Sequence, residues 1–270
     1  MILGNASTYS EIFDDLKCCV LIPTYNNAAT LGVVLKAVLG YTSNVLVVDD
    51  GSTDGTSSIL KCLPKLQVIH FSRNQGKGAA LRKGFLRAEE LGYEYAISID
   101  SDGQHFPDDL PVFLKALEQK KPNDAELLIV GSRKMDDPSV PDKSSVGNKL
   151  SSFWYWVETG IRLSDTQCGY RLYPLKLVNS LQLFTSRFEL EIEVLVKAAW
   201  EGVNVKNLPV KVFYDPKERV THFRPFQDVL RITLLNVYLI GFGLFVVAPR
   251  AIYRRFRGLS AKPRVEDFGG

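Results

Sequence analysis

Several signatures that often indicate a function are missing from this sequence of 270 residues. None of its cysteines forms a CxxC pair with zinc-type spacing, so no zinc finger or zinc ribbon is predicted. These cysteines are Cys18, Cys19, Cys62 and Cys168. The N-terminal segment carries acidic residues where a signal peptide would be basic and then apolar, among them Glu11, Asp14 and Asp15. We therefore expect the protein to face the reducing cytoplasm.

The sequence also lacks internal repeats and low-complexity segments. Its net charge of +3 is too small to predict a nucleic-acid surface, so we expect no nucleic acid as a partner. A GxxxxGK[ST] loop is absent, and the first apolar run leads into residues 23–27 (Pro-Thr-Tyr-Asn-Asn) instead of a GxGxxG sequence. A P-loop enzyme and a dinucleotide-binding enzyme are thereby excluded. With 46% hydrophobic residues, the chain can still bury a large core.

The first half shows a regular alternation of short apolar runs and amphipathic segments. The predicted strands are residues 18–24, 45–49, 66–71, 95–99 and 127–131. The predicted helices between them are residues 30–39, 55–62, 77–91 and 108–118. This alternation predicts βαβ units, and therefore an α/β fold with a mostly parallel sheet flanked by helices.

The second half is less regular. Residues 135–147 are polar and contain two prolines, which predicts a surface loop. Beyond this loop we expect a helix around 153–159, a turn-rich stretch over 165–174, a helix over 189–200 and a strand near 203–213.

Polar residues follow the predicted strands at their carboxyl ends, where open α/β sheets bind their ligands. After the fourth strand, Asp100 and Asp102 lie one residue apart and Gln104 adds another oxygen. This set suits Mg²⁺ or Mn²⁺ and leaves coordination positions for the phosphates of a nucleotide diphosphate. A solvated turn is the alternative, because an Asp-X-Asp sequence alone is a weak signal.

Two other strand ends carry candidate nucleotide-binding residues. Asp49 and Asp50 could accept hydrogen bonds from a base or a ribose; alternatively, both shape a turn while Asp54 caps the next helix. Lys77 stands at the start of a predicted helix, where backbone N–H groups and the helix dipole favour an anion. For Lys77, the alternative is a solvated surface side chain.

Six short motifs follow one another along the chain. They are Pro-Thr-Tyr-Asn (23–26), Asp-Asp-Gly-Ser-Thr-Asp-Gly-Thr (49–56), Asn-Gln-Gly-Lys-Gly (74–78), Asp-Ser-Asp-Gly-Gln-His (100–105), Gly-Ser-Arg (131–133) and Cys-Gly-Tyr-Arg (168–171). In this order they resemble glycosyltransferase family 2 with its GT-A fold, a Rossmann-like α/β fold, and most closely its dolichyl-phosphate mannose synthase-like branch. The resemblance covers roughly residues 18–215.

The resemblance implies a donor site and a metal site. Together with the strand-end acids, the predicted nucleotide-binding residues are Pro23, Tyr25, Asn26, Asp49, Asp50, Lys77 and Asp100. The implied metal ligands are Asp100, Asp102 and Gln104. Members often carry Glu at the position of Asn27, so the base of the donor stays open between a GDP-sugar and a UDP-sugar.

The acceptor is the part of the site where this sequence departs from the family. Residues 215–226 differ from the basic segment that usually follows the last strand, although their arginines could still hold an anion. The predicted acceptor-binding residues are Arg133, Lys149, Arg219, His222 and Arg224. The resemblance places Arg133 near the phosphates of donor or acceptor, whereas a hydrogen-bonded structural role is the alternative for His222.

Glutamates alternate with apolar residues at the start of the helix predicted over 189–200. One of Glu189, Glu191 and Glu193 could orient an acceptor or act as a base, and Glu191 is our candidate. The alternative is an acidic first turn favoured by the helix dipole. The predicted catalytic residues are Asp102, Arg133 and Glu191.

The carboxyl end combines an apolar run with a basic tail. Residues 232–249 are apolar apart from Asn236 and the glycines. This run is slightly shorter than the roughly 20 residues that span a bilayer. The basic residues around and after this run are Arg231, Arg250, Arg254, Arg255, Arg257, Lys262 and Arg264. We predict a catalytic domain over 1–228 and a segment over 229–270 that spans or lies in the membrane at its cytoplasmic face. A buried core helix is the alternative.

Together these features predict an inverting hexosyltransferase that moves a sugar from a nucleotide diphosphate to a membrane lipid, polyprenyl phosphate above all. A phosphate acceptor needs no base at neutral pH, whereas a hydroxyl acceptor, as in a glycolipid or polysaccharide, would need one. Two other classes remain open, a nucleotidyltransferase, whose Gly-rich triphosphate loop is absent, and a non-catalytic, membrane-associated nucleotide-binding module.

Overall fold

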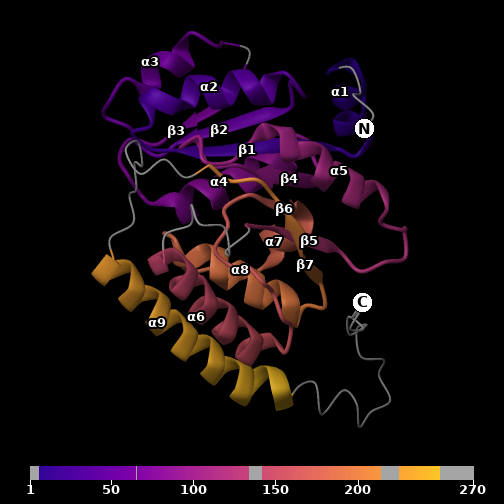
Figure 1. Ribbon diagram of the computed structural model, residues 1–270, viewed down its shortest axis with the longest axis vertical. Helices are drawn as coiled ribbons and strands as arrows, with labels where there is room; N and C mark the ends of the chain where they lie inside the picture. The colour runs from indigo at the N-terminus through magenta and orange to yellow at the C-terminus, as the bar shows by residue number, and fades with distance from the viewer. Residues whose placement is uncertain (1–5, 65, 134–141, 214–224, 250–270) are drawn as a thin grey trace.

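The computed structural model describes residues 6–64, 66–133, 142–213 and 225–249. Within these residues the centre is a seven-stranded sheet with the order β3-β2-β1-β4-β6-β5-β7 (Figure 1). The strands are β1 Cys18–Thr24, β2 Val45–Asp49, β3 Gln67–His70, β4 Tyr95–Ser98, β5 Leu127–Ser132, β6 Arg171–Pro174 and β7 Asn204–Pro209. Neighbouring strands are parallel except at β6, which is antiparallel to both β4 and β5. The mostly parallel sheet confirms the predicted fold class.

Helices cover both faces of this sheet. In Figure 1, α2, α3 and α5 lie on one side of the strands, and α4, α7 and α8 lie on the other. Every residue of β1, β2 and β4 is consequently buried, which explains why these strands are continuous apolar runs in the sequence. The helices are α1 Ala6–Asp15, α2 Ala28–Leu39, α3 Thr56–Lys61, α4 Lys77–Glu90, η1 Pro107–Asp109, α5 Leu110–Glu118, α6 Asp142–Thr159, α7 Leu175–Ser180, α8 Glu189–Trp200, α9 Pro225–Phe242 and η2 Gly243–Val247.

The second half differs from the prediction in two places. Strand β6 lies in the stretch predicted as turns, because a strand of four residues is too short to show a period, and its pairing with β4 and β5 decides its conformation. Helix α6 begins at Asp142, so the predicted loop over 135–147 is wrong for residues 142–147. Residues 134–141 lie outside the described residues.

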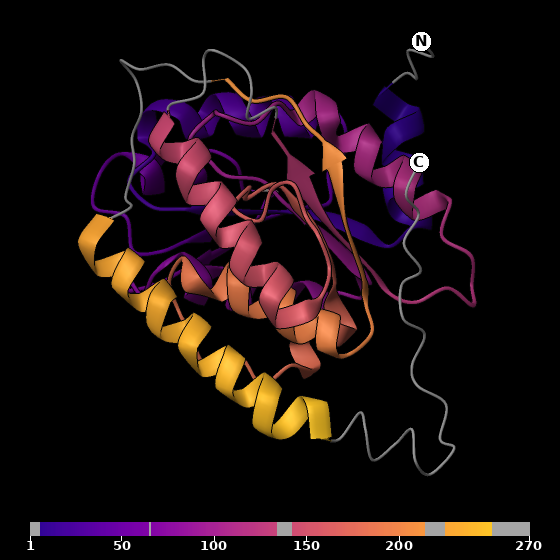
Figure 2. The same ribbon diagram turned by 60° about the horizontal axis from the view of Figure 1, so that its bottom comes forward.

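Helices α6, α8 and α9 lie side by side at one end of the molecule (Figures 1 and 2). One helix of the described chain is long and apolar enough to cross a membrane, the 22-residue stretch Phe226–Val247, and only 17% of its most apolar window is buried. A narrow row of α9 side chains is buried against the rest of the protein. It comprises Asp228, Leu235, Asn236 and Leu239. Because so little of this helix is buried, the alternative that the apolar run forms a buried core helix is disfavoured. Residues 250–270, with most of the basic tail, lie outside the described residues.

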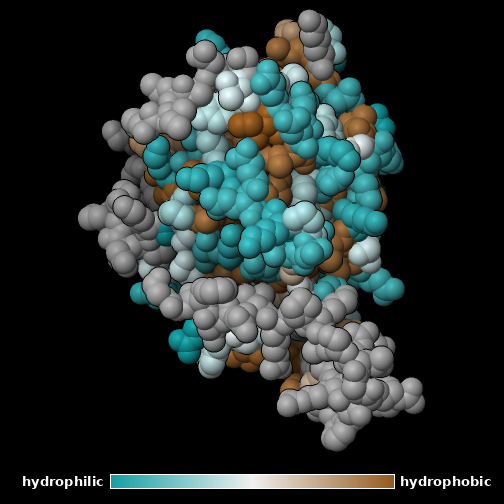
Figure 3. All heavy atoms as spheres, turned by 90° about the vertical axis from the view of Figure 1, so that its right-hand side faces the viewer, coloured by the Kyte–Doolittle hydropathy of each residue, from teal (hydrophilic) through white to brown (hydrophobic). Residues whose placement is uncertain are grey.

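Most of the large apolar side chains that the described residues expose belong to α6, α9 and η2. On α6 they are Val146, Leu150, Phe153, Trp156 and Val157, and on α9 and η2 they are Phe226, Val229, Leu230, Leu234, Val237, Tyr238, Leu244 and Phe245. The side of the molecule shown in Figure 3 carries mainly hydrophilic residues by comparison. An exposed apolar surface of this kind usually marks a contact with a partner or a membrane.

Candidate active site

The loops after β1 and β4 are joined at the carboxyl edge of the sheet. The Asn27 amide donates to Ser101 Oγ at 2.8 Å, and Ser101 Oγ donates to the Pro23 carbonyl at 3.2 Å. Thr30 Oγ1 donates to the carbonyl of Ser101 at 2.6 Å. These bonds connect residues more than seventy positions apart, so the predicted nucleotide residues Pro23, Tyr25 and Asn26 lie beside the predicted metal loop.

Asp49 and Asp50 are both buried at the end of β2, and each holds a loop. Asp49 accepts hydrogen bonds from the Ser52 N–H at 2.9 Å and from Ser57 Oγ at 2.8 Å. Burial opposes the ionised form of Asp49, but these bonds and His70 lower its pKa below the ordinary value.

Asp50 accepts backbone N–H bonds from Gln75 at 2.7 Å and Gly76 at 2.8 Å, and one from the Asn74 amide at 3.0 Å. Burial raises the pKa of Asp50, and the two backbone bonds offset part of that rise. Asp54 bonds the N–H groups of Ala28 and Thr56 at the starts of α2 and α3. The turn-shaping contacts expected as the alternative are therefore present, and nucleotide binding by Asp49 and Asp50 stays a prediction.

The centre of the site is an ion-pair chain that starts at Asp100. Lys77 Nζ lies 2.7 Å from Asp100 Oδ1 and 3.1 Å from Glu191 Oε2. Arg171, which is 1% exposed, lies 3.6 Å from the other oxygen of Glu191. Burial alone would lower the pKa of Lys77, but the carboxylates of Asp100 and Glu191 outweigh it and raise that pKa well above the ordinary value. Lys77 is therefore a paired, partly buried cation rather than a solvated one.

The main chain at Gly169 closes against this ion pair. A Cβ atom added to Gly169 would lie 2.8 Å from Lys77 Nζ and would overlap Asp100 Oδ2. Ser98 Oγ holds the Gly169 carbonyl at 2.7 Å, so this backbone is fixed to the end of β4. Any larger residue here would have to displace the paired side chains of Asp100 and Lys77, which gives a physical reason for the glycine of the Cys-Gly-Tyr-Arg motif.

The predicted metal ligands fit a divalent cation. Asp102 forms no ion pair with a cationic side chain of the described residues, and its Oδ1 accepts the Gln104 N–H at 2.9 Å. Burial and the negative charge of Asp100 raise the pKa of Asp102, as expected for two carboxylates that share one site. The described residues hold no group of three His, Cys, Asp or Glu side chains around one point. A cation here would therefore use both carboxylates and the Gln104 amide, with positions left for phosphate oxygens.

Arg133 is held by a carboxylate that the sequence analysis missed. Its Nε donates to Asp165 Oδ2 at 2.7 Å and its Nη2 donates to Asp165 Oδ1 at 3.0 Å. Asp165 is completely buried and also accepts the N–H groups of Gln167 and Cys168. The paired donors of a guanidinium match the two oxygens of a carboxylate, so this arrangement fixes the plane of Arg133 at the end of β5.

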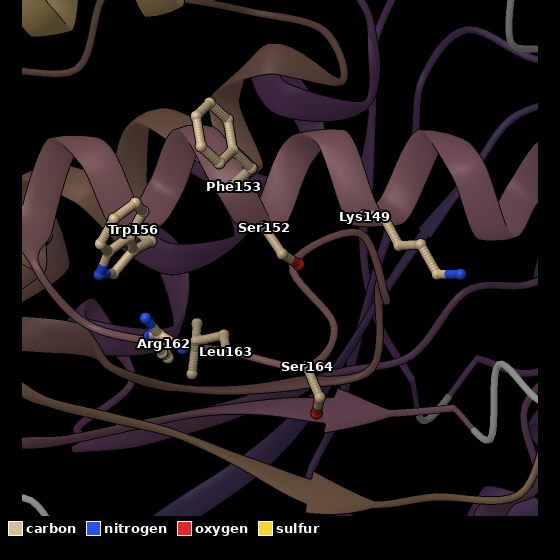
Figure 4. Close-up of a pocket in the computed structure, with 7 residues that line it drawn as sticks. All are labelled: Lys149, Ser152, Phe153, Trp156, Arg162, Leu163 and Ser164. Carbon is tan, nitrogen blue, oxygen red and sulfur yellow. The ribbon is translucent and has the colours of Figure 1, made fainter.

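Lys149 lines an open pocket that also includes Ser164, the residue before Asp165 (Figure 4). The pocket has a volume of about 420 Å³ and lies between α6 and the segment that leads to Ser164. Its wall is lined by Lys149, Ser152, Phe153, Trp156, Arg162, Leu163 and Ser164. Arg162 lies over the Trp156 ring at 5.2 Å, and Ser164 Oγ is 2.8 Å from Ser132 Oγ. The pocket thus combines two cations with an apolar wall.

The remaining predicted acceptor residues, Arg219, His222 and Arg224, lie outside the described residues. The chain that leads to them is attached to the metal loop. The Phe213 N–H donates to the Gln104 carbonyl at 2.9 Å, and His105 pairs with Val212 in an isolated bridge.

Asp165 and Arg171 are the site residues that sequence reasoning missed. Arg171 ends the Cys-Gly-Tyr-Arg motif, but the sequence does not show its partners. Its guanidinium donates to the carbonyls of Cys168 and Thr166, at 2.6 and 2.9 Å, and forms an ion pair with Glu191. The Asp-Thr-Gln-Cys sequence at 165–168 has the form of an Asx turn, which is a signal for Asp165. No local signal pairs that turn with Arg133.

The comparisons with known proteins identify the family of this chain. The family model described as "Glycosyl transferase family 2" matches residues 19–181, which is more than half of the chain. The chain therefore belongs to glycosyltransferase family 2 and is a glycosyltransferase. It is 30% identical to a UDP-N-acetylglucosamine--dolichyl-phosphate N-acetylglucosaminyltransferase of Methanococcus voltae, over 72% of this chain and 85% of the relative.

Two further proteins extend the comparison. An undecaprenyl-phosphate mannosyltransferase of Micrococcus luteus is 27% identical, over 72% of this chain and 83% of that protein. The crystal structure of glucosyl-3-phosphoglycerate synthase from Mycobacterium tuberculosis, in complex with Mn²⁺, UDP and glucosyl-3-phosphoglycerate, superposes with a TM-score of 0.62 at 17% identity. It covers 89% of this chain and 84% of its own, and at this identity it supports the GT-A fold alone.

Proposed function

We propose that the protein is an inverting glycosyltransferase that moves a sugar from a GDP- or UDP-linked donor to a polyprenyl phosphate. The observation that carries this proposal is the acidic pair Asp100 and Asp102 beside Lys77, at the carboxyl edge of a family 2 fold. The named relatives whose acceptors are dolichyl and undecaprenyl phosphates support the choice of acceptor class.

The donor would bind along the carboxyl ends of β1, β2 and β4. Asp100, Asp102 and Gln104 would hold Mg²⁺ or Mn²⁺, which when bound offsets the negative charge that develops on the departing diphosphate. The base and ribose would lie against the loops after β1 and β2. The residues assigned to them are Pro23, Tyr25, Asn26, Asp49 and Asp50. Lys77, at the first position of α4, adds a cation where the helix dipole also favours phosphate.

The acceptor phosphate would bind on the other side of the metal loop. Arg133, fixed by Asp165, and Lys149, at the rim of the pocket in Figure 4, are the predicted acceptor cations that the structure describes. The other members of the proposed acceptor set are Arg219, His222 and Arg224, which lie outside the described residues and follow Phe213, whose N–H donates to the Gln104 carbonyl. The apolar wall of Phe153 and Trp156 suits the carbon chain next to such a phosphate.

A phosphate acceptor removes the need for a general base. Its oxygens are already ionised at neutral pH and can attack the anomeric carbon directly. Glu191, the candidate base for a hydroxyl acceptor, faces the cations of Lys77 and Arg171, one at each oxygen. This geometry suits a carboxylate that holds Lys77 in place, and it favours the phosphate acceptor over the hydroxyl acceptor.

The membrane supplies this acceptor, and α9 is the element suited to contact it. Its inward row packs on the domain along the helix axis, while its outer face is apolar, so we propose that α9 lies in the plane of the cytoplasmic membrane surface. In this proposal residues 1–228 form the catalytic domain and residues 229–270 form the membrane-associated segment. Helix α9 itself begins at Pro225, just before that division.

The test is an acceptor panel with the purified protein. Radiolabelled GDP- and UDP-sugars are incubated with Mn²⁺ and either polyprenyl phosphate, the neutral polyprenol or a soluble saccharide in matched detergent. We expect labelled product from polyprenyl phosphate with one nucleotide class. Equal transfer to the neutral lipid or the saccharide would refute the phosphate acceptor, and Glu191 would then be examined as a base. Failure to bind any nucleotide sugar would support a non-catalytic module.

A further inference from the structure

Lys77 forms an ion pair with Asp100, one of the two carboxylates proposed to bind the metal. Its ammonium lies 2.7 Å from Asp100 Oδ1, and the backbone of Gly169 stands against the other oxygen, Oδ2. Asp100 therefore has a lysine on one oxygen and the main chain of Gly169 near the other, and its side chain is 26% exposed. A divalent cation that binds Asp100 Oδ1 competes with Lys77 for that oxygen.

Lys77 has a second carboxylate on which it can remain. Glu191 Oε2 lies 3.1 Å from its ammonium, and the Glu191 side chain is 8% exposed. Arg171 cannot take over this role, because its guanidinium already donates to the carbonyls of Cys168, Thr166 and Glu191. A lysine ammonium on a flexible stem can move by one or two ångströms without losing its donors, whereas this arginine is fixed.

We propose that Lys77 is a resident counter-ion that a divalent cation displaces from Asp100, after which its ammonium stays on Glu191 and turns to the donor diphosphate. This inference rests on the proposed function. Before the metal binds, Lys77 neutralises one carboxylate of the acidic pair. When the metal binds, repulsion between the two cations and attraction to phosphate favour the displaced position. Glu191 is then a positioning residue for Lys77.

Displacement predicts opposite effects of one substitution on two ligands. Lys77→Gln should bind Mn²⁺ alone about tenfold more tightly than the unaltered protein, because no ammonium competes for Asp100. The same variant, saturated with Mn²⁺, should bind UDP or GDP about tenfold more weakly, because the diphosphate loses a cation. Calorimetric titration measures both constants. Lys83→Gln, an exposed lysine on the same helix, is the matched control and should change neither. Unchanged or weaker Mn²⁺ binding by Lys77→Gln overturns the proposal.

A second measurement separates displacement from simple repulsion and does not depend on the folding of Lys77→Gln. In ¹⁵N-labelled protein, the ammonium signal of Lys77 is the one lost in Lys77→Arg, which keeps the charge. Addition of diamagnetic Mg²⁺ should shift that signal, and a second shift should follow when UDP or GDP is added. An unmoved signal at saturating Mg²⁺ means that Lys77 stays on Asp100 and overturns displacement. Absence of metal-dependent nucleotide binding by the unaltered protein is a different result, and it would refute the proposed function instead.

Discussion

Arg133 and Asp165 form a two-point contact in which both oxygens of a completely buried carboxylate accept guanidinium N–H bonds, at 2.7 and 3.0 Å. The contact joins the end of β5 to the turn before β6, two segments whose strands are antiparallel neighbours. A residue predicted to bind phosphate is thus oriented by a partner in the protein core. The orientation of the Arg133 guanidinium therefore depends on Asp165.

Removing the charge of Asp165 should cost both stability and activity. Asp165→Asn removes the negative charge that accepts two N–H bonds from the mostly buried Arg133 guanidinium, and loss of one partner of such a pair lowers the free energy of unfolding by about 3 kcal/mol. Urea unfolding followed by circular dichroism measures the change. The control is Glu90→Gln, which removes an exposed partner of Arg87 and should leave stability nearly unchanged. Equal stability of Asp165→Asn and Glu90→Gln would contradict the structural role of Asp165.

Neutralising Asp102 should abolish metal-dependent donor binding without unfolding the protein. Asp102→Asn removes a charged oxygen ligand that has no other cation to balance it among the described residues, so we expect nucleotide affinity in Mn²⁺ to fall at least about tenfold. Calorimetry with and without Mn²⁺ provides the measurement. Asp108→Asn changes an exposed acid in η1, shortly after the loop, and should behave like the unaltered protein. If Asp102→Asn keeps full metal-dependent affinity, the metal ligands are wrongly assigned.

Glu158 should make stability depend on pH. Within the part of the chain that the structure describes, both of its carboxylate oxygens are buried without a hydrogen-bond partner, and burial raises its pKa from 4.5 to about 8. Between these values the folded protein binds a proton that the unfolded chain has lost, so the free energy of unfolding falls as pH rises from about 4.5 to about 8. The slope from this group is at most about 1.4 kcal/mol per pH unit.

Glu158→Gln should remove that contribution. Urea unfolding at pH 6 and pH 8 is the measurement, and the variant should lose less stability between the two values than the unaltered protein does. Glu118→Gln, an exposed glutamate at the end of α5, serves as the control and should retain the original dependence. The same pH dependence in the Glu158→Gln variant would show that other groups cause it.

The outer face of α9 should determine membrane binding. Leu234 and Val237 are 62% and 65% exposed, so replacing both with Glu should barely affect folding. Each lost apolar side chain weakens partition by about 1 kcal/mol or more, and the double variant should bind anionic liposomes at least about tenfold more weakly in sedimentation. Val33→Glu on α2, a residue 72% exposed, is the control. Undiminished liposome binding by the double variant would place the contact elsewhere.

Local patterns in the sequence were sufficient to predict the alternating strands and helices of the first half. The period of apolar residues encodes such elements directly, and parallel strands bring their carboxyl ends to one edge, so Asp50 and Asp100 could be assigned to one crevice. The motifs were also sufficient for the family, which the family model confirms over residues 19–181. The start of α6 at Asp142 could not be predicted, because the polar residues before it show no period.

The ion-pair chain through Lys77 depended on tertiary structure. Insertion of β6 between β4 and β5 brings Gly169 against Asp100 and Arg171 against Glu191, and α8 brings Glu191 to Lys77. These contacts cannot be predicted from the spacing of residues in the sequence, since side chains far apart in sequence meet only when the sheet is assembled. The sequence alone thus determined which residue types stand at the strand ends, and the packing of later elements decided which partner each of those charges received.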